Sequence, residues 1–365
     1  MVSSPGVETF NKSFDTIVKN RQRRLQGKHN CIPFGMPRLE KYVPGVERGM
    51  YTIVTANSGV GKSKITKLLF VLRAYDFIKN NPDCGLKLKI YYFSLEESKE
   101  VLIQSLISYE LYRRYKIRVD VKQLNSMYQD EVLGEDVIEK IHSLKEYFEE
   151  FIENCLTIYT MISTPTGIYN KMVQHALERG TLVDGVYTPH DPEEIVMPIV
   201  DHFSLVQPEK GQTLHQAMDM LSSRYMVNLR NVYGMSPVGV QQQSSDKEKQ
   251  VYTATGSSVE SKLEPSLDGL ADNKKTQRDA DMVLGLFAPD RYEIDRHRGY
   301  DVKRMQDSYR SLSVLKNRYG ISNLRVGLFF DGAVGEFLEL PGAKETDKMS
   351  KVFDLINKNN GARTS

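Results

Sequence analysis

One short segment of the sequence has the residue types and spacing that bind phosphate groups. Its glycines let backbone N–H groups curl around phosphates, and the helix expected to start next adds partial positive charge. Lys62 is then predicted to reach the β- and γ-phosphates of a nucleotide, and the Ser63 hydroxyl to coordinate Mg²⁺. Alanine replaces the first glycine of the usual phosphate-binding (Walker A) pattern. The predicted loop comprises Ala56, Asn57, Ser58, Gly59, Val60, Gly61, Lys62 and Ser63.

Acidic residues follow two apolar runs and could supply the rest of a nucleotide site. The run 195–200 leads directly into Asp201, and the run 88–94 is followed after one residue by Glu96 and Glu97. Ligands of open α/β sheets bind beyond the carboxyl ends of the strands. Asp201 is therefore predicted as a second Mg²⁺ ligand acting through water, and one glutamate as the group that orients or deprotonates the attacking water. Spacing alone does not separate Glu96 from Glu97, and each acid has a reading as a surface or helix-capping carboxylate.

The sequence around these residues alternates short apolar runs with longer amphipathic stretches. This alternation predicts an α/β fold with a mostly parallel sheet that is flanked by helices on both faces. The expected strands of this sheet are residues 50–55, 88–94, 156–159, 195–200, 238–241 and 282–287. The expected helices are residues 62–79, 99–115, 135–152, 168–179 and 214–232.

Three later apolar runs lie too close together for helical connections. They are residues 311–315, 324–330 and 335–340, and they predict an antiparallel C-terminal extension of the sheet. Pro198 is unexpected inside the strand 195–200, because proline lacks the N–H that a central strand donates. A bulge, an edge position or a later strand start would accommodate it.

Composition narrows the class of protein. The 365 residues are 40% hydrophobic and 26% charged, which suits a folded domain with small appendages rather than a disordered chain. No apolar run approaches the roughly 18 residues of a membrane span, so no membrane association is expected. Three scattered cysteines without metal-ligand spacing predict a reducing, cytoplasmic setting. A net charge of +2 neither favours nor excludes nucleic acid as a partner.

The chain is expected to divide into an arm (1–30), a large domain (31–341) and a polar tail (342–365) with at most one short helix near 349–356. Helical spacing places the apolar arm residues Val7, Phe10, Phe14, Ile17 and Val18 on one helix face. That face could dock on the chain's own domain or on a neighbouring subunit, and the sequence leaves both open.

Six motifs, in order, resemble the RecA-like motor domain of DnaB-type hexameric replicative helicases. Residues 32–39 resemble the segment ahead of that family's P-loop, and Phe93-Ser94-Leu95-Glu96 matches its Ser-Leu-Glu motif, whose glutamate is the catalytic base. Residues 201–206 resemble its second acidic motif. Gln242 matches a glutamine at a strand end that senses the γ-phosphate, and residues 279–281 match an Ala-Asp strand start. The resemblance thus favours Glu96 over Glu97 and covers residues 31–340.

The sixth motif, Lys316-Asn317-Arg318-Tyr319-Gly320, resembles the family's Lys-x-Arg-x-Gly strand end. There the lysine and arginine reach into the neighbouring subunit's nucleotide site, so Lys316 and Arg318 are implied to act in trans. The alternative is that both decorate a strand end facing solvent. The family's N-terminal domain is replaced here by the thirty-residue arm, and Ser204 and Gln243 depart from the commonest bacterial versions, which favours a divergent, phage-type member.

The resemblance implies an ATP- and Mg²⁺-dependent helicase motor that forms a hexameric ring on single-stranded DNA. A primase or helicase loader is a further implied partner, and the setting is the cytoplasm of a bacterium or of a phage-infected host. Two rival functions stay open. One is a recombinase-like or clock-like ring ATPase without unwinding activity, and the other is an adaptor or loader that uses nucleotide only as a switch.

The polar segment 244–278 has no helix or strand period and is expected to be functional or disordered. In a ring it would form the pore loop, where phosphate contacts from basic side chains grip single-stranded nucleic acid. Lys274, Lys275 and Arg278 are the predicted contacts, since they cluster beside the strand 282–287. Because the segment has as many acids as bases, a disordered surface insertion is the alternative. Lys210, in the segment 207–213, is a second and weaker candidate.

Overall fold

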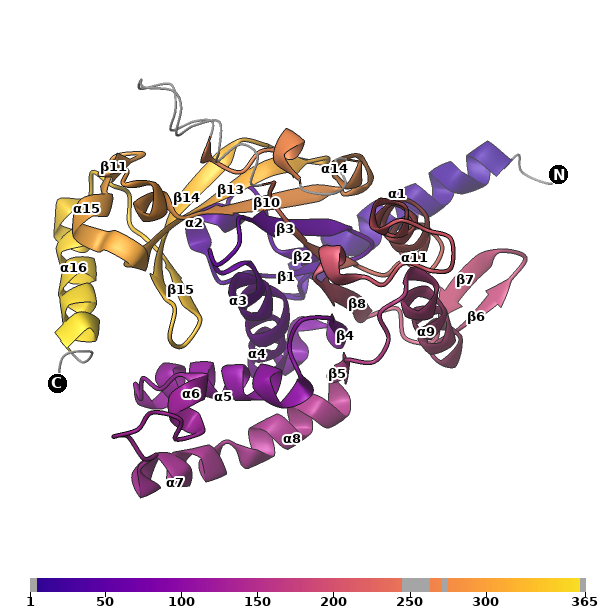
Figure 1. The fold of residues 1–365 in the computed structure, drawn as a ribbon. Helices are drawn as coiled ribbons and strands as arrows, with labels where there is room; N and C mark the ends of the chain where they lie inside the picture. Colours follow the sequence, from indigo (N-terminus) through magenta and orange to yellow (C-terminus); the bar gives the residue numbers. More distant parts are fainter. Residues whose placement is uncertain (1–4, 245–262, 271–274, 362–365) are drawn as a thin grey trace.

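Figure 1 shows the computed structural model, which describes residues 5–244, 263–270 and 275–361. Within these residues a nine-stranded sheet has the order β15-β14-β13-β10-β3-β9-β8-β4-β5. Neighbouring strands from β10 to β5 run parallel. Strands β13, β14 and β15 continue the sheet antiparallel from β10. The predicted α/β fold, a mostly parallel sheet with an antiparallel C-terminal extension, is confirmed.

The strands lie close to their predicted positions. The parallel strands are β3 (Thr52–Ala56), β4 (Lys87–Ser94), β5 (Leu156–Tyr159), β8 (Glu194–Asp201), β9 (Val238–Gln242) and β10 (Met282–Phe287). The antiparallel strands are β13 (Tyr309–Asn317), β14 (Leu324–Asp331) and β15 (Glu336–Glu339). β5 and β10 have the predicted bounds, and the other strands begin and end within about two residues of the prediction, because apolar runs mark strands buried on both faces.

Helices cover both faces of this sheet (Figure 1). One face packs against α3 (Lys62–Thr66), which continues through a π-helical segment (Lys67–Leu72) into α4 (Arg73–Asn80), and against α5 (Lys99–Tyr115) and α8 (Lys145–Asn154). The other packs against α9 (Pro165–Glu178) and α10 (Leu214–Asp219), which continues through a second π-helical segment (Met220–Met226) into α11 (Val227–Asn231). The predicted helix 135–152 is two helices, α7 (Glu135–Ser143) and α8, interrupted at Leu144.

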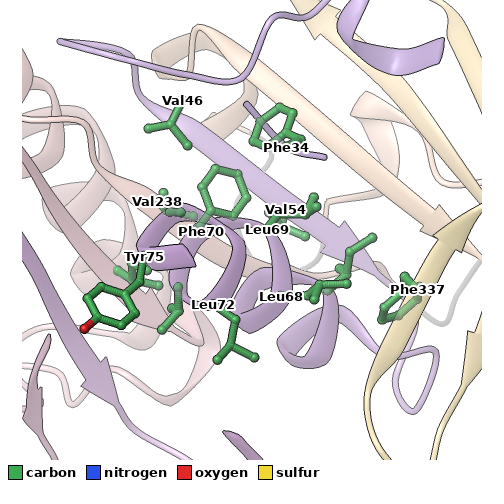
Figure 2. Close-up of a cluster of buried hydrophobic side chains, with 14 of the residues drawn as sticks. Phe34, Val46, Val54, Leu68, Leu69, Phe70, Leu72, Tyr75, Val238 and Phe337 are labelled. Carbon is green, nitrogen blue, oxygen red and sulfur yellow. The ribbon is translucent and has the colours of Figure 1, made fainter. Parts of the chain in front are cut away.

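The core between β3 and the helix that follows the P-loop holds that helix in place. Figure 2 shows Val54 of β3 beside Leu68 and Leu69 of the helix, in the same cluster as Phe34 and Phe70. The neighbouring strand residue Ile53 points to the opposite face and joins the second core. Because successive strand residues alternate between two buried faces, β3 reads as a continuous apolar run. The two cores together fix the loop at the end of β3.

Pro198 lies inside β8 without a bulge. β8 pairs with β4 along its length, with Pro198 opposite Tyr91. Pairing with β9 on the other side begins only at Ile199. The Val196 carbonyl, two residues before the proline and therefore on the same edge, already faces the chain ahead of β9 and accepts from Ser236 N–H. The proline thus precedes the β8–β9 ladder, and its missing N–H leaves no ladder bond unmade.

The N-terminal arm is one helix, α1 (Pro5–Leu25), that extends away from the sheet (Figure 1). Phe10, Phe14 and Ile17 are 68%, 55% and 66% exposed, so its apolar face does not dock on the chain's own domain. Only the end of the helix is anchored. The buried Arg23 donates to the carbonyls of His29 and Gly85 at 2.8 and 2.7 Å and pairs with Glu193 at the start of β8.

Some elements were not predicted. A hairpin, β6 (Gly180–Val183) and β7 (Val186–Pro189), precedes β8, and positive φ angles at Asp184 and Gly185 form its two-residue turn. The tail helix α16 (Thr346–Gly361) is longer than expected, because Met349 and Ile356 pack into a core with Tyr300. The remaining short elements are β1 (Cys31–Ile32), α2 (Pro37–Glu40), β2 (Val46–Glu47), α6 (Val121–Leu124), α14 (Thr276–Asp279), β11 (Arg296–His297), β12 (Tyr300–Asp301) and α15 (Val302–Met305).

Candidate nucleotide-binding site

The P-loop connects β3 to α3 in a conformation that requires its glycines. Gly59 and Gly61 have positive φ angles of 71° and 110°, a region where side chains with a Cβ are strained. A Cβ on Gly61 would also lie 3.3 Å from Phe337 and 3.4 Å from Phe330. Lys62 begins α3 and is largely buried. Backbone N–H groups of the loop and the start of this helix can therefore surround a phosphate.

A buried arginine braces the P-loop from β13. Arg310, 1% exposed, donates from Nε to the Val60 carbonyl at 2.9 Å. Its guanidinium lies 4.3 Å from the centre of the Phe330 ring and donates to Asp307 at 2.7 Å. Burial lowers the pKa of Arg310, and Asp307 opposes this shift. Sequence analysis missed this residue, although an arginine within an apolar strand was a visible signal.

Two residues of the turn after β10 contact the other side of the P-loop. Asn57 Nδ2 donates to the Tyr292 hydroxyl at 2.6 Å. The Arg291 guanidinium donates to the Ser58 carbonyl and lies 3.6 Å from the position that a Cβ on Gly59 would take. An exposed cation and an aromatic ring thus adjoin the loop from the same chain, and neither was predicted from the sequence.

Ser63 and Asp201 meet beside the P-loop. Ser63 Oγ donates to Asp201 Oδ1 at 3.0 Å, and the Tyr92 hydroxyl donates to Asp201 Oδ2 at 2.6 Å. Burial raises the pKa of Asp201, and the hydrogen bond from Tyr92 opposes this shift. A serine hydroxyl beside a carboxylate is a donor set that suits Mg²⁺, which prefers oxygen ligands and takes others from phosphates. Sequence analysis assigned the tyrosines to packing and therefore missed Tyr92.

The structure gives Glu96 and Glu97 different surroundings. Glu97 Oε2 lies 2.9 Å from Lys67 Nζ, which also donates to Ser105 Oγ at 3.1 Å. Glu96 has a side chain 55% exposed, and its Oε2 lies 3.6 Å from Nε2 of the buried His202. An accessible carboxylate at the end of β4 can reach water, whereas one paired with a buried lysine is held. The geometry therefore favours Glu96 as the base, although this role stays a prediction.

Three consecutive glutamines end β9 and its continuation. Gln241 accepts a hydrogen bond from Thr276 at 2.6 Å, and Gln243 donates to Thr55 at 3.0 Å. Gln242 lies between them on the opposite face, in register with the first residue of the P-loop. That face is the one covered by α3. Gln242 is thus placed beside the phosphate site, as its predicted role requires.

Lys316 and Arg318 bind the segment that leads into β10. Lys316 Nζ donates to the carbonyls of residues 277, 278 and 280 at 2.6, 3.2 and 2.7 Å. Arg318 Nη1 lies 2.7 Å from Asp281 Oδ1, and its Nη2 donates to the Arg278 carbonyl at 3.1 Å. Both cations are therefore held by α14 and the residues next to it.

These two cations lie far from the P-loop of their own chain. Lys316 pairs with Val283 near the start of β10, whereas Leu286 at the other end pairs with Ala56 of the P-loop. Three residues of strand separate these levels by roughly 10 Å, and both side chains point further away, toward residues 277–281. The structure therefore brings Lys62, Ser63, Glu96, Asp201 and Gln242 together and leaves Lys316 and Arg318 out.

The predicted DNA contacts are only partly described. Lys274 lies outside the described residues. Lys275 is exposed and 3.0 Å from Asp219, and Arg278 is exposed at the end of α14. Lys210 is exposed in the turn between β8 and α10.

Part of the predicted loop 244–278 is packed rather than structureless. Leu263 and Leu270 are buried, and Gln243 forms a bridge with Leu270. The carboxylate of Glu264 accepts hydrogen bonds from His297, Arg298 and Arg325 at 2.9, 2.8 and 3.1 Å. Residues 263–270 therefore form an anchored base, because their few apolar side chains reach cores that local periodicity does not reveal.

Two searches of the described residues gave negative results. No group of three or more histidine, cysteine, aspartate or glutamate side chains in these ranges could hold a metal ion. A metal at Ser63 and Asp201 would therefore depend on a bound nucleotide for further ligands. No helix in the described part of the chain has the length and apolarity to cross a membrane.

Comparisons with known proteins identify the fold. No family model matches the sequence, and no curated protein is similar to it. A solved structure of the ATPase domain of a DnaB-like helicase aligns with a TM-score of 0.65 and 16% identity, over 93% of this chain and 100% of that one. A DnaB-like replicative helicase, described together with its interactions with primase, aligns with a TM-score of 0.63 and 16% identity, over 93% of this chain and 72% of that one. The chain therefore has the RecA-like fold of DnaB-like helicase ATPase domains, as its motifs predicted.

Proposed function

We propose that this chain is the motor subunit of a DnaB-type ring that hydrolyses ATP, moves along single-stranded DNA and unwinds duplex DNA during replication. The observation that carries the proposal is the separation of the site between the two ends of one sheet. The P-loop, Ser63 and Asp201 lie at one end, and Lys316 and Arg318 lie at the other. Subunits arranged head to tail would join the two halves.

Each group at the P-loop end has a separate task in this proposal. The P-loop backbone and Lys62 bind the phosphates, and Ser63 and Asp201 hold Mg²⁺, which neutralises developing charge on the phosphate oxygens. Glu96 accepts the proton of the attacking water, or orients that water, from its accessible position beside His202. Gln242 lies next to the first residue of the loop and detects whether the terminal phosphate is present.

The neighbouring subunit completes the site. A fixed arginine near the transferred phosphate contributes about 10³-fold or more in rate, and Arg318 is the proposed source, with Lys316 beside it. The exposed apolar face of α1 supports an assembly role as well, because Phe10, Phe14 and Ile17 have little contact with their own domain. In the proposed hexamer this face docks on an adjacent subunit.

Nucleic acid would contact the same end of the sheet as these cations. Arg278 is exposed on α14, and Lys275 next to it is exposed and paired with Asp219. Lys210 is the second candidate, and we propose these side chains, with Lys274, as contacts to DNA phosphates. A primase or loader is the proposed further partner. The three cysteines are free thiols, in keeping with the proposed cytoplasm of a bacterium or phage-infected host.

One experiment tests the proposal as a whole. ATP hydrolysis, particle mass by light scattering and displacement of a labelled strand from a fork are measured together, with and without single-stranded DNA. We expect a ring-sized particle, DNA-stimulated hydrolysis and strand displacement, and loss of the large particle when residues 1–28 are removed. Hydrolysis at full speed by a monomer would overturn the shared site. Hydrolysis by rings that displace no strand would instead support a ring ATPase without unwinding activity.

A further inference from the structure

Tyr92 contacts the proposed metal-side carboxylate from inside the sheet. The residue is 1% exposed, and its hydroxyl donates to Asp201 Oδ2 at 2.6 Å. The other carboxylate oxygen, Oδ1, accepts from Ser63 Oγ at 3.0 Å. Each oxygen of the buried Asp201 thus has its own hydroxyl donor, and the two donors come from different elements, β4 and α3.

The register of the sheet explains why Tyr92 reaches this carboxylate. β4 and β8 run parallel, with Tyr92 opposite Ile199 and Ser94 opposite Asp201. Tyr92 and Asp201 are therefore diagonal neighbours on one face, a separation that long aromatic side chains span. β4 lies between β5 and β8 and is paired along both edges. The phenol is consequently fixed by the interior of the sheet rather than by a surface loop.

The contact has a physical consequence for a metal at this position. A buried carboxylate oxygen without a donor is costly, so Asp201 would rotate or recruit water if the phenol were removed. With the phenol present, Oδ2 is occupied and the carboxylate keeps Oδ1 toward Ser63. Hydrogen-bond partners of this kind orient metal ligands, and losing one lowers metal affinity by about 10- to 100-fold.

We infer that Tyr92 is a positioning residue for the Mg²⁺ of the nucleotide site. Its hydroxyl holds the Asp201 carboxylate in the orientation that keeps the metal beside Ser63. The inference rests on one part of the proposed function, namely that this site binds nucleotide together with Mg²⁺. It does not depend on ring assembly, DNA or unwinding.

Tyr92→Phe tests the inference, because it removes one oxygen and keeps the ring. Binding of a fluorescent ATP analogue to the full chain is titrated with Mg²⁺ and repeated in excess chelator. We expect the Mg²⁺ concentration for half-maximal enhancement of binding to rise about tenfold. The affinity without metal stays at the wild-type value, and kcat recovers at saturating Mg²⁺. Equal half-saturation in the variant and the wild type would overturn the inference.

Tyr91→Phe is the matched control. Tyr91 is the preceding residue of the same strand, equally buried, and its ring stacks on His175 at 4.2 Å on the opposite face. Its Mg²⁺ dependence should match the wild type, and a similar shift in both variants would mean a general loosening of β4. A merely structural role for Tyr92 would weaken binding with and without metal alike.

A double-mutant cycle separates Tyr92 from its partner. If Tyr92 acts through Asp201, adding Y92F to Asp201→Asn changes the half-saturating Mg²⁺ concentration little, whereas independent effects would multiply. This comparison also covers the case in which Y92F alone folds poorly, since the Asp201→Asn change relieves the buried charge in both members of the pair. Wild-type protein that binds the nucleotide without any Mg²⁺ enhancement would contradict the proposed function itself, a result distinct from failure of the Tyr92 inference.

Discussion

Two buried aspartates lie at opposite ends of the central sheet in contrasting surroundings. Asp201, the last residue of β8, accepts hydrogen bonds from the hydroxyls of Ser63 and Tyr92. Asp281, just before β10, lies 2.7 Å from Arg318 Nη1 and 2.8 Å from Arg230 Nη1. Hydroxyls satisfy the oxygens of a carboxylate but leave its charge, whereas two guanidinium groups neutralise it. Charge compensation, more than burial, separates a carboxylate suited to a metal from one that holds the fold together.

Asp201→Asn is the largest expected break in this comparison. The amide keeps the shape and removes the charge, so ATP turnover is expected to fall by about 10³-fold. The thermal midpoint should stay the same or rise, because an uncompensated buried charge is lost. Hydrolysis assays and thermal unfolding on the same preparation measure both. Turnover within a few-fold of wild type would remove Asp201 from the reaction.

Arg318→Ala tests whether the far end of the sheet serves another subunit. We expect turnover to drop by about 10³-fold with nucleotide affinity unchanged, since the P-loop is untouched. Lys62→Ala should also be inactive. Mixing the two variants should restore activity, because some interfaces then combine an intact P-loop with an intact arginine. A mixture no more active than its components, under conditions where subunits exchange, would argue against a shared site.

Asp281→Asn probes the compensated aspartate. Two guanidinium groups lose their counter-charge, and we expect the free energy of unfolding to fall by about 3 kcal/mol, measured by urea denaturation. Nucleotide affinity at the opposite end should not change. Asp279→Asn is the matched control, because Asp279 accepts hydrogen bonds from Ser222 and Ser223. Its loss should cost only about 1 kcal/mol.

A second pair of carboxylates gives the smallest effect, in the pH dependence of stability. Burial raises the pKa of Glu336 to about 6, with Arg73 at 3.5 Å opposing the shift. The pKa of Glu264 is lowered to about 2: burial would raise it, but hydrogen bonds from His297 and Arg298 and the charge of Arg325 outweigh burial.

The two shifts have opposite signs in stability. Glu336 binds its proton more tightly when folded, so its contribution declines as pH rises from about 4.5 to 6, by about 2 kcal/mol. Glu264 contributes stability above about pH 4.5 that is lost as pH falls toward 2. In denaturation series across these ranges, Glu336→Gln should remove the decline and Glu264→Gln the acid loss. Exchanged behaviour of the two variants would contradict the assigned surroundings.

The sequence predicted what local patterns determine. The bounds of β5, β10 and α5 and the P-loop follow from apolar periodicity and from glycine and lysine spacing, so they could be placed without knowing any partner. Tyr92 and Arg310 could not, because their roles depend on contacts with residues 109 and 250 positions away in the chain. A tyrosine in a buried strand has the same local pattern whether its hydroxyl meets a carboxylate or not.

Errors in the prediction have the same origin. The tail helix α16 extends beyond the expected 349–356 because its apolar face meets Tyr300 and Met305. Residues 263–270 were read as part of a structureless loop because their few apolar side chains enter cores built by β10 and its neighbours. Pro198 raised an objection to its strand that the late start of the β8–β9 ladder removes.

The three carbonyl contacts of Lys316 have a mechanical consequence for the proposed ring. They grip the turn that carries Arg278, so this turn cannot shift without loosening or redirecting the lysine. A tug from the nucleic acid on one subunit would then be felt at the catalytic pocket next door through a linkage only a few bonds long. Firing order around the ring could be set by the strand itself, with no separate relay between subunits.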